Sequence, residues 1–237
     1  MIIRERNGSL LLIRQPDHAA LARRIMQQWG PLRDIERRES ILTAVGAHDN
    51  GWAVPDSAPI VHAHSGELLD FVALPLAMRQ GVWPRAVGNL AADPWAAALV
   101  AHHAIFVYDR FRGRGDWAEF FRTMERERDA MLQRVQTATS DDLTRDYTFV
   151  RLGDLASLTF CCGWTDTQRF AGCAMQLHGT RLLIDPDPFE GRETAIDVSA
   201  RELPVRRYVS DADAAQEFAR APLIQLRGTV AGAQPHA

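Results

Sequence analysis

The chain has 237 residues, of which 46% are hydrophobic and 24% charged, and its formal net charge is −3. This composition is typical of a globular protein and excludes disordered, collagen-like and coiled-coil chains. The slight acidic balance argues against a general nucleic-acid-binding protein, which usually carries a basic excess. All 27 basic residues are arginine. Without lysine, Schiff-base catalysis and a Walker A phosphate site are excluded, so arginine, histidine or backbone N–H groups must bind any anion.

The cysteines and the apolar segments bear on the compartment. Cys161, Cys162 and Cys173 form no CxxC pair, which excludes a four-cysteine zinc site and argues against a disulfide framework. No apolar run is long enough for a transmembrane helix, and the first residues lack the apolar stretch of a signal peptide. We therefore expect a cytoplasmic protein with no membrane partner, and the use of arginine alone is typical of a GC-rich bacterial genome.

The first part of the chain predicts a hairpin followed by helices. Residues 2–14 form the predicted β-hairpin, because two apolar runs flank the turn pair Asn7-Gly8. Proline-containing starts and stops bound a helix at 15–29, and a second helix is predicted at 34–47. Residues 50–90 contain several prolines and glycines, which favours a long ordered loop region with one short helix.

The remaining chain predicts three more helices and then strands. The helices cover residues 93–109, 116–137 and 141–162, and the last of them is almost wholly apolar after its midpoint. Beyond residue 166, short apolar stretches between turns predict strands. These strands lie at 174–177, 182–184, 195–198, 205–209 and 223–226, with a short helix at 211–220.

This order of elements predicts a mainly α fold with a small β element, α+β overall. We expect one compact body over residues 1–237, with a helical core at 15–165. A β-rich element from 1–14 and 166–229 should pack on this core, and residues 230–237 should form a disordered tail. Because an isolated hairpin is marginally stable in water, we expect the N-terminal hairpin to pair with the C-terminal strands.

Four of the predicted helices place ionisable residues on an otherwise apolar face or at its end. These residues are His18, His48 with Asp49, His102 with His103, and Asp154. A buried carboxylate is costly unless it is paired, and metal coordination by imidazoles and carboxylates from several helices removes that cost. A single histidine on an apolar face is more often a core residue, so the set indicates a metal site more strongly than any one member.

The order His, His-Asp, Asp resembles the HD superfamily of metal-dependent phosphohydrolases. The segment ILTAVGAHDNGW (41–52) is similar to the helix of that superfamily that ends in His-Asp, and RLGDLASL is similar to the segment of its last aspartate. More closely, the chain resembles a bacterial family of unassigned function with the motifs QxDH and HDxGW and a later histidine-bearing helix. Here these motifs read QPDH, HDNGW and ALVAHH, and the alignment places the later histidine at His103 rather than His102.

The resemblance implies an HD-like helical core over 15–165 and one or two divalent transition-metal ions, drawn from Mn, Fe, Zn, Co or Ni. The implied metal ligands are His18, His48, Asp49, His103 and Asp154. Asp49 is the expected central ligand, and Asp49 and His103 are the expected catalytic residues. The expected substrate-binding residues, chosen because arginine neutralises phosphate and an aromatic ring can line a pocket, are Arg23, Trp52, Arg110 and Arg114.

The leading hypothesis is a metal-dependent hydrolase that acts on a small phosphoester or nucleotide. A di-iron oxygenase with the same helical fold stays open, with His102 or His103 as an added ligand. A non-catalytic metal- or ligand-binding protein also stays open. HDNGW lacks the lysine that often follows His-Asp in the superfamily, which leaves the substrate class less defined than the metal. We expect a small-molecule partner and no nucleic acid, and a homodimer stays open.

Overall fold

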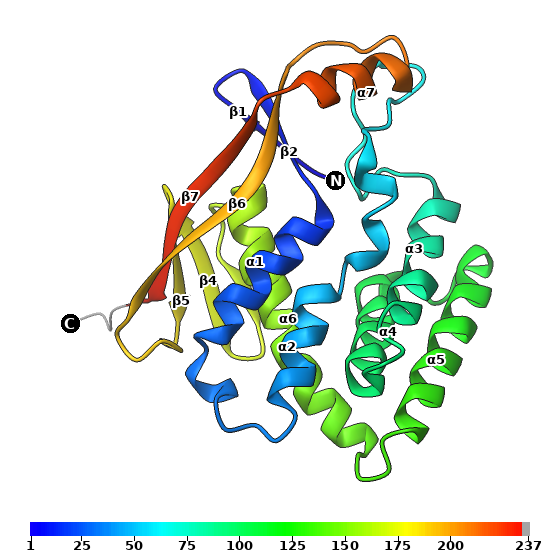
Figure 1. The fold of residues 1–237 in the computed structure, drawn as a ribbon, viewed down its shortest axis with the longest axis vertical. Helices are drawn as coiled ribbons and strands as arrows, with labels where there is room; N and C mark the ends of the chain where they lie inside the picture. The colour runs from blue at the N-terminus through cyan, green and yellow to red at the C-terminus, as the bar shows by residue number, and fades with distance from the viewer. Residues whose placement is uncertain (234–237) are drawn as a thin grey trace.

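A seven-stranded mixed sheet forms one side of the molecule, with the strand order β1-β2-β6-β7-β5-β4-β3 (Figure 1). The computed structural model describes residues 1–233. The strands are β1 (Ile2–Arg6), β2 (Ser9–Ile13), β3 (Gln168–Phe170), β4 (Cys173–His178), β5 (Arg181–Asp185), β6 (Glu193–Pro204) and β7 (Leu223–Gly232). Strands β5 and β7 pair in parallel, and the other neighbouring strands pair antiparallel.

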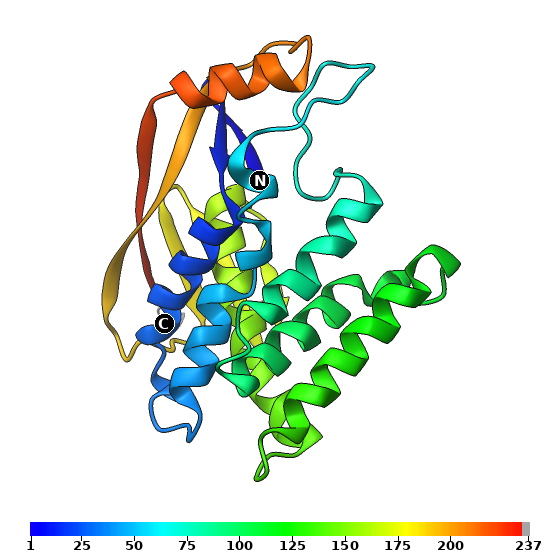
Figure 2. The same ribbon diagram turned by 45° about the vertical axis from the view of Figure 1, so that its right-hand side comes forward.

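Helices cover one face of this sheet in two layers, as the turned view shows (Figure 2). The helices are α1 (Gln15–Gln27), α2 (Arg38–Ala47), α3 (Leu76–Gly88), α4 (Pro94–Tyr108), α5 (Ala118–Gln133), α6 (Ser140–Cys162) and α7 (Asp211–Arg220). Helices α1 and α6 contact the strands directly, α2 and α4 pack behind them, and α3 and α5 pack against α4. Within residues 1–233, no helix combines the length and the apolar character needed to cross a membrane.

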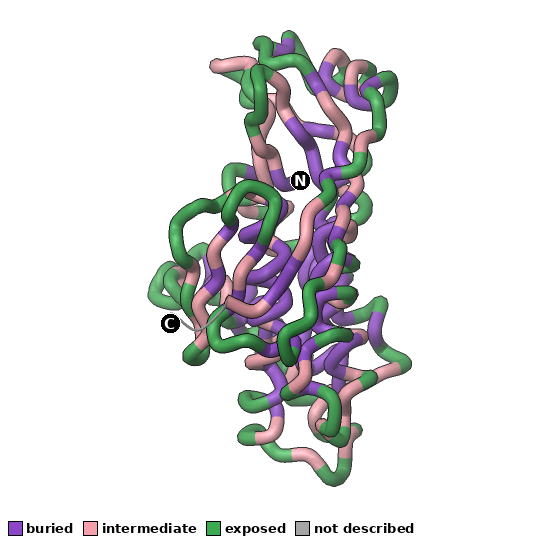
Figure 3. Tube along the Cα trace, turned by 90° about the vertical axis from the view of Figure 1, so that its left-hand side faces the viewer, coloured by how far each residue is buried: buried purple, intermediate pink, exposed green. Residues whose placement is uncertain are grey.

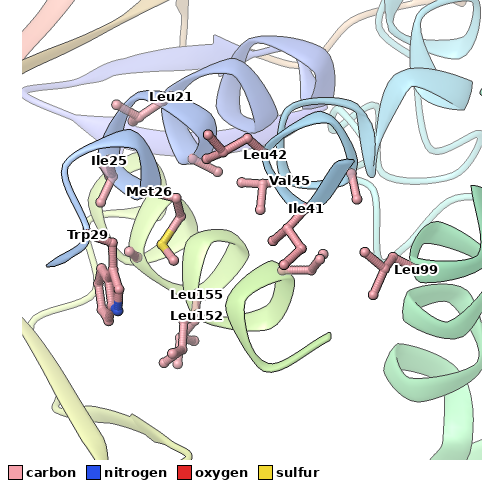
Figure 4. Close-up of a cluster of buried hydrophobic side chains, with 14 of the residues drawn as sticks. Leu21, Ile25, Met26, Trp29, Ile41, Leu42, Val45, Leu99, Leu152 and Leu155 are labelled. Carbon is pink, nitrogen blue, oxygen red and sulfur yellow. The ribbon is translucent and has the colours of Figure 1, made fainter. Parts of the chain in front are cut away.

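The main hydrophobic core lies where α1, α2 and α6 meet. Leu21 and Ile25 from α1, Ile41 from α2 and Leu155 from α6 interdigitate there (Figure 4), and each is almost fully buried. Figure 3 shows that buried segments concentrate between the helices and the sheet, whereas the turns are exposed. Gly153 lets α6 approach its neighbours, because a Cβ at this position would lie 2.8 Å from Met26 Cγ. This close packing also constrains the backbone of Asp154, the residue that follows Gly153.

The expectation of a mainly α fold with a small β element is wrong. The chain is α+β, with 49% helix and 21% strand, and all its strands join one sheet. Only the most apolar part of each long strand was predicted as a strand. Strand β6 has 12 residues that alternate between buried and less buried positions, which is the period of a strand with one covered face.

The ends of the sheet agree with the sequence in part. The hairpin of β1 and β2 is confirmed, with Asn7 and Gly8 at φ angles of 51° and 79°, and β2 pairs with β6 as expected. A strand at 205–209 is wrong, because these residues form the connection from β6 to α7 and Val209 is 90% exposed. Strand β7 includes residues 230–232 of the expected tail, and residues 234–237 lie outside the described residues.

The region 50–90 is more helical than the sequence indicates. Two short 3₁₀ turns, Asn50–Trp52 and Pro55–Ser57, precede the 13-residue helix α3, which continues through Pro84. Gly51 allows the first turn to lie directly on α3, since a Cβ on Gly51 would lie 2.0 Å from the carbonyl oxygen of Val82. This contact holds the chain that follows Asp49 against α3.

Substitution Gly51→Ala should therefore destabilise the protein by about 2–3 kcal/mol, because its new methyl group meets backbone atoms that cannot move independently. Gly81→Ala is the matched control. It lies inside α3 with open space around its Cβ position, so it should stabilise the protein by up to about 1 kcal/mol. Urea denaturation of both variants measures the difference, and equal effects would contradict this packing.

Candidate metal centre

Five buried ionisable side chains converge from α1, α4, α6 and the end of α2. They are His18 in α1, His48 directly after α2, Asp49, His103 in α4 and Asp154 in α6. Their ligand atoms form two groups within 4.8 Å: His18, His48 and Asp49, and His48, His103 and Asp154. The structure thus brings together all five residues that the sequence suggested as metal ligands. His48 is common to both groups and lies at the centre of this cluster.

Each histidine turns its Nε2 atom toward a carboxylate. His18 Nε2 lies 2.8 Å from Asp49 Oδ2. His48 Nε2 lies 3.6 Å from that same oxygen and 3.4 Å from Asp154 Oδ1. His103 Nε2 lies 3.9 Å from Asp154 Oδ2. The carboxylates and the three Nε2 atoms therefore face one shared space.

The hydrogen bonds of the Nδ1 atoms assign the tautomers of two of these histidines. His48 Nδ1 lies 2.7 Å from the carbonyl oxygen of Val45, which can only accept, so Nδ1 carries a proton. His18 Nδ1 lies 2.8 Å from Ser157 Oγ, and Ser157 donates its own proton to the carbonyl oxygen of Asp154. Ser157 therefore accepts from His18, and the neutral form of each histidine has a bare Nε2.

A bare Nε2 that faces a carboxylate oxygen is unfavourable, because both atoms are hydrogen-bond acceptors. His48 Nε2 is buried and has no hydrogen-bond partner among the described residues. A cation between these atoms removes the repulsion, either as a proton on the imidazole or as a metal ion. The set of imidazole nitrogens and carboxylate oxygens fits a divalent transition metal, and the Nδ1 contacts to Val45 and Ser157 are the outer hydrogen bonds that such ligands require.

Electrostatics within the cluster favour a positive charge at His48. Burial alone would lower the pKa of His48, but the carboxylates of Asp49 and Asp154 outweigh it and raise this pKa to about 9. Burial opposes the ionisation of Asp154, yet His48, His103 and Arg151 hold the pKa of Asp154 well below its usual range. Without a metal, a proton on His48 therefore supplies the cation, and a metal ion that binds there must displace it.

A cavity of about 310 Å³ opens onto the cluster. Asp49, His103 and Asp154 line it, together with aromatic side chains and the guanidinium groups of Arg79, Arg110 and Arg151. A larger cavity of about 420 Å³ lies between β2, β6 and the start of α1 and does not reach the cluster. The smaller cavity is therefore the one through which a ligand can contact the candidate metal site.

The cavity includes two of the four expected substrate-binding residues. Trp52 and Arg110 line it. Arg23 instead packs over Gly46, where a glycine Cβ would lie 2.8 Å from its Cδ. Arg114 is largely exposed and forms an ion pair with Asp116. The structure therefore does not bring Arg23 or Arg114 to the site.

Other residues of the site were not among the expected ligands or substrate-binding residues. Arg151 forms an ion pair with Asp154, and Tyr147 lies 3.1 Å from His103 Nδ1 through its hydroxyl group. The pairing of Arg151 with Asp154, three residues apart on one helix, had been open from the sequence as an alternative role for Asp154. Arg79 gave no such signal, because its segment was interpreted as a loop. His102 contacts Tyr147 edge to face and belongs to neither ligand group, so His103 is the histidine of α4 that faces the site.

The pKa of His48 predicts how the metal-free protein responds to pH. Because this pKa is about 9 in the folded state and 6.5 in a free side chain, the stabilising charge is fully present below pH 6.5 and is lost as the pH rises toward 9. Chelator-treated protein should lose up to about 3 kcal/mol of unfolding free energy over this range, as urea denaturation can measure.

His48→Asn is the matched control for this experiment. Asparagine can still donate to the carbonyl oxygen of Val45 but has no group at the position of Nε2. Its unfolding free energy should change much less between pH 6.5 and pH 9 than that of the wild-type protein. Equal pH dependence in the two proteins would show that His48 does not hold the charge.

Comparisons with known proteins identify a family. No curated protein and no solved structure matches the chain. A family model matches residues 1–205, which run from β1 through β6 and include the five clustered residues and the whole lining of the cavity. Helix α7 and strand β7 lie beyond the match. The chain therefore belongs to the family described as Protein of unknown function (DUF3891).

Proposed function

We propose that this protein is a metal-dependent hydrolase that acts on a small phosphoester. The observation that carries the proposal is that the Nε2 atoms of His18 and His48, each bare in the neutral form, face carboxylates beside an arginine-lined cavity. The His, His-Asp, Asp order that resembles the HD superfamily supports the same chemistry. When bound, a divalent ion lowers the pKa of a water molecule and polarises a phosphoryl oxygen.

The residues that would hold the ion are His18, His48, Asp49, His103 and Asp154. The two possible ligand groups share His48. Because Nδ1 of His48 is used by the Val45 carbonyl, this imidazole has one nitrogen left for one ion. The arrangement therefore favours a single ion, bound through one group or through parts of both.

Asp49 and His103 are the proposed catalytic residues because they belong to the cluster and also line the cavity. Asp49 would accept a proton from the attacking water. Burial lowers the pKa of His103 to about 3, so its imidazole is neutral, and the hydroxyl group of Tyr147 at Nδ1 orients it. In the reaction the water oxygen bonds to phosphorus and the ester P–O bond breaks. The ester oxygen would leave as an alcohol after it takes up the proton that Asp49 accepted from the water.

The three arginines of the cavity supply the charge that a phosphate group requires. The planar guanidinium group matches two phosphoryl oxygens at once. Arg151 is already paired with Asp154, whereas Arg79 and Arg110 have no carboxylate partner within residues 1–233. A phosphoester in this cavity would therefore gain ion pairs without breaking existing ones at Arg79 and Arg110.

A hydrolysis assay with a panel of phosphate monoesters tests this proposal, with Mn, Fe, Zn, Co or Ni added in turn to chelator-treated protein. We expect turnover that requires one of these ions. Asp154→Asn and His18→Asn should reduce kcat by about 100-fold or more, because each loses a ligand. Circular dichroism should first establish that both variants are folded.

His178→Asn provides the matched histidine control, because His178 is exposed at the end of β4 and belongs to neither ligand group. Its turnover should equal that of the wild-type protein. Hydrolysis that survives the loss of Asp154 or complete chelation would contradict the proposed site. Bound iron with turnover that consumes dioxygen, and no phosphoester hydrolysis, would replace the proposal with an oxygenase.

A further inference from the structure

The cavity beside the cluster is lined by two chemically different kinds of residue. Its charged part consists of the three arginines and the carboxylates of Asp49 and Asp154. Apart from Gln15 and His103, the rest is apolar or aromatic and consists of Trp52, Phe71, Val72, Trp83, Val107, Tyr108, Leu158 and Trp164. Val72 and Trp164 are 49% and 37% exposed, so the apolar lining continues to the surface. A ligand that fills this cavity therefore needs both a charged group and an apolar body.

The lining also holds two uncharged polar atoms that are buried without a hydrogen-bond partner among the described residues, Gln15 Oε1 and Trp83 Nε1. A ligand can supply a donor to the first and an acceptor to the second, so the lining tolerates polar substituents on an aromatic ligand.

Arg79 is the arginine best placed to bind the anionic group. It projects from α3, and its Cζ lies 5.7 Å from the centroid of the Trp117 ring, which holds the guanidinium group in one place. Its Nε is buried without a hydrogen-bond partner. A buried N–H group of a charged side chain that lines a cavity indicates an acceptor supplied by a ligand.

We propose that the ligand is a phosphate ester whose organic part is aromatic. Arg79 determines specificity for the phosphoryl oxygens, and Trp164 packs against the aromatic body at the open end. As a statement about a substrate, this inference rests on the proposed phosphoester hydrolysis. As a statement about binding, it rests only on the lining of the cavity and can be tested without turnover.

Three phosphonates test this inference, because their C–P bond is not hydrolysed like an ester. Calorimetric titration should compare phenylphosphonate, methylphosphonate and 2,3-dihydroxypropylphosphonate, with both metal-loaded and chelator-treated protein. We expect phenylphosphonate to bind about tenfold more tightly than methylphosphonate, because a stacked aromatic ring contributes roughly that factor. The dihydroxypropyl compound has an organic part without an aromatic ring and should bind less tightly than phenylphosphonate.

Substitutions separate the contributions of the charged and the aromatic lining residues to binding. Arg79→Gln should weaken all three phosphonates by about tenfold, because each loses a charge-assisted hydrogen bond. Trp164→Ala should remove the preference for the phenyl group and leave methylphosphonate binding unchanged. Arg85→Gln is the matched control, since Arg85 is an exposed arginine on the same helix that does not line the cavity. Its affinities should equal those of the wild-type protein.

The outcomes distinguish this inference from the proposed function. Equal affinity for the phenyl and dihydroxypropyl compounds, or an Arg79→Gln variant with unchanged affinities, would overturn the inference even if the protein hydrolyses phosphoesters. The expected binding pattern without hydrolysis under any metal would support the inference and contradict the proposed function. Thermal melting of Arg79→Gln and Trp164→Ala, compared with Arg85→Gln, shows whether each variant keeps its fold.

Discussion

A positive charge between His48, Asp49 and Asp154 is the interaction on which this structure depends. The buried carboxylates of Asp49 and Asp154 lie 3.6 Å and 3.4 Å from His48 Nε2 and repel each other. The His48 Nε2 atom that both face is bare in the neutral form. Unpaired charges in such an environment destabilise a protein by several kcal/mol. The cluster is therefore stable only when a proton or a metal ion supplies the missing charge, and the proton on His48 marks the position where a metal ion would bind.

Close packing of α1 and α6 against each other and against the sheet holds the side chains of this cluster in place. Asp154 and Ser157 lie three residues apart on α6, so one turn of the helix supplies a carboxylate to the centre and a hydroxyl group that fixes His18. Gly153 brings that turn close to α1, and the sheet supports α1 and α6 from behind. Rigid packing of this kind is what a site of preorganised ligands requires.

The cluster also lies between two hydrophobic cores. One core joins α1, α2 and α6 to the sheet, and the other joins α3 to α5 and to the far end of α4 around Trp83 and Trp117. The cavity is lined by Trp83 and Tyr108 of the second core and by Leu158, which packs against the first. A ligand bound there would contact both cores, which explains why its charged and aromatic surroundings come from helices far apart in the sequence.

Local patterns in the sequence were sufficient to select the five clustered residues and the helices that carry three of them. They failed where the answer depended on three-dimensional position. Arg23 was chosen because it lies one turn beyond His18, but five residues rotate a helix by about 140° from the starting face, so its side chain points elsewhere. Arg79 was missed because Pro84 and the neighbouring glycines predicted a loop where the structure has α3. The size of the sheet was underestimated because polar residues such as Asp197, Ser199 and Arg201 alternate with the buried apolar residues of β6.

The metal content of the purified protein tests the central claim most directly. Elemental mass spectrometry of untagged wild-type protein, after incubation with each ion and removal of excess, should find about one equivalent of Mn, Fe, Co, Ni or Zn. The His48→Asn protein should contain much less, although it keeps the hydrogen bond to the Val45 carbonyl. If neither protein binds metal under any of these conditions, or both bind it equally, the cluster is a proton-stabilised polar core and the proposed hydrolase is wrong.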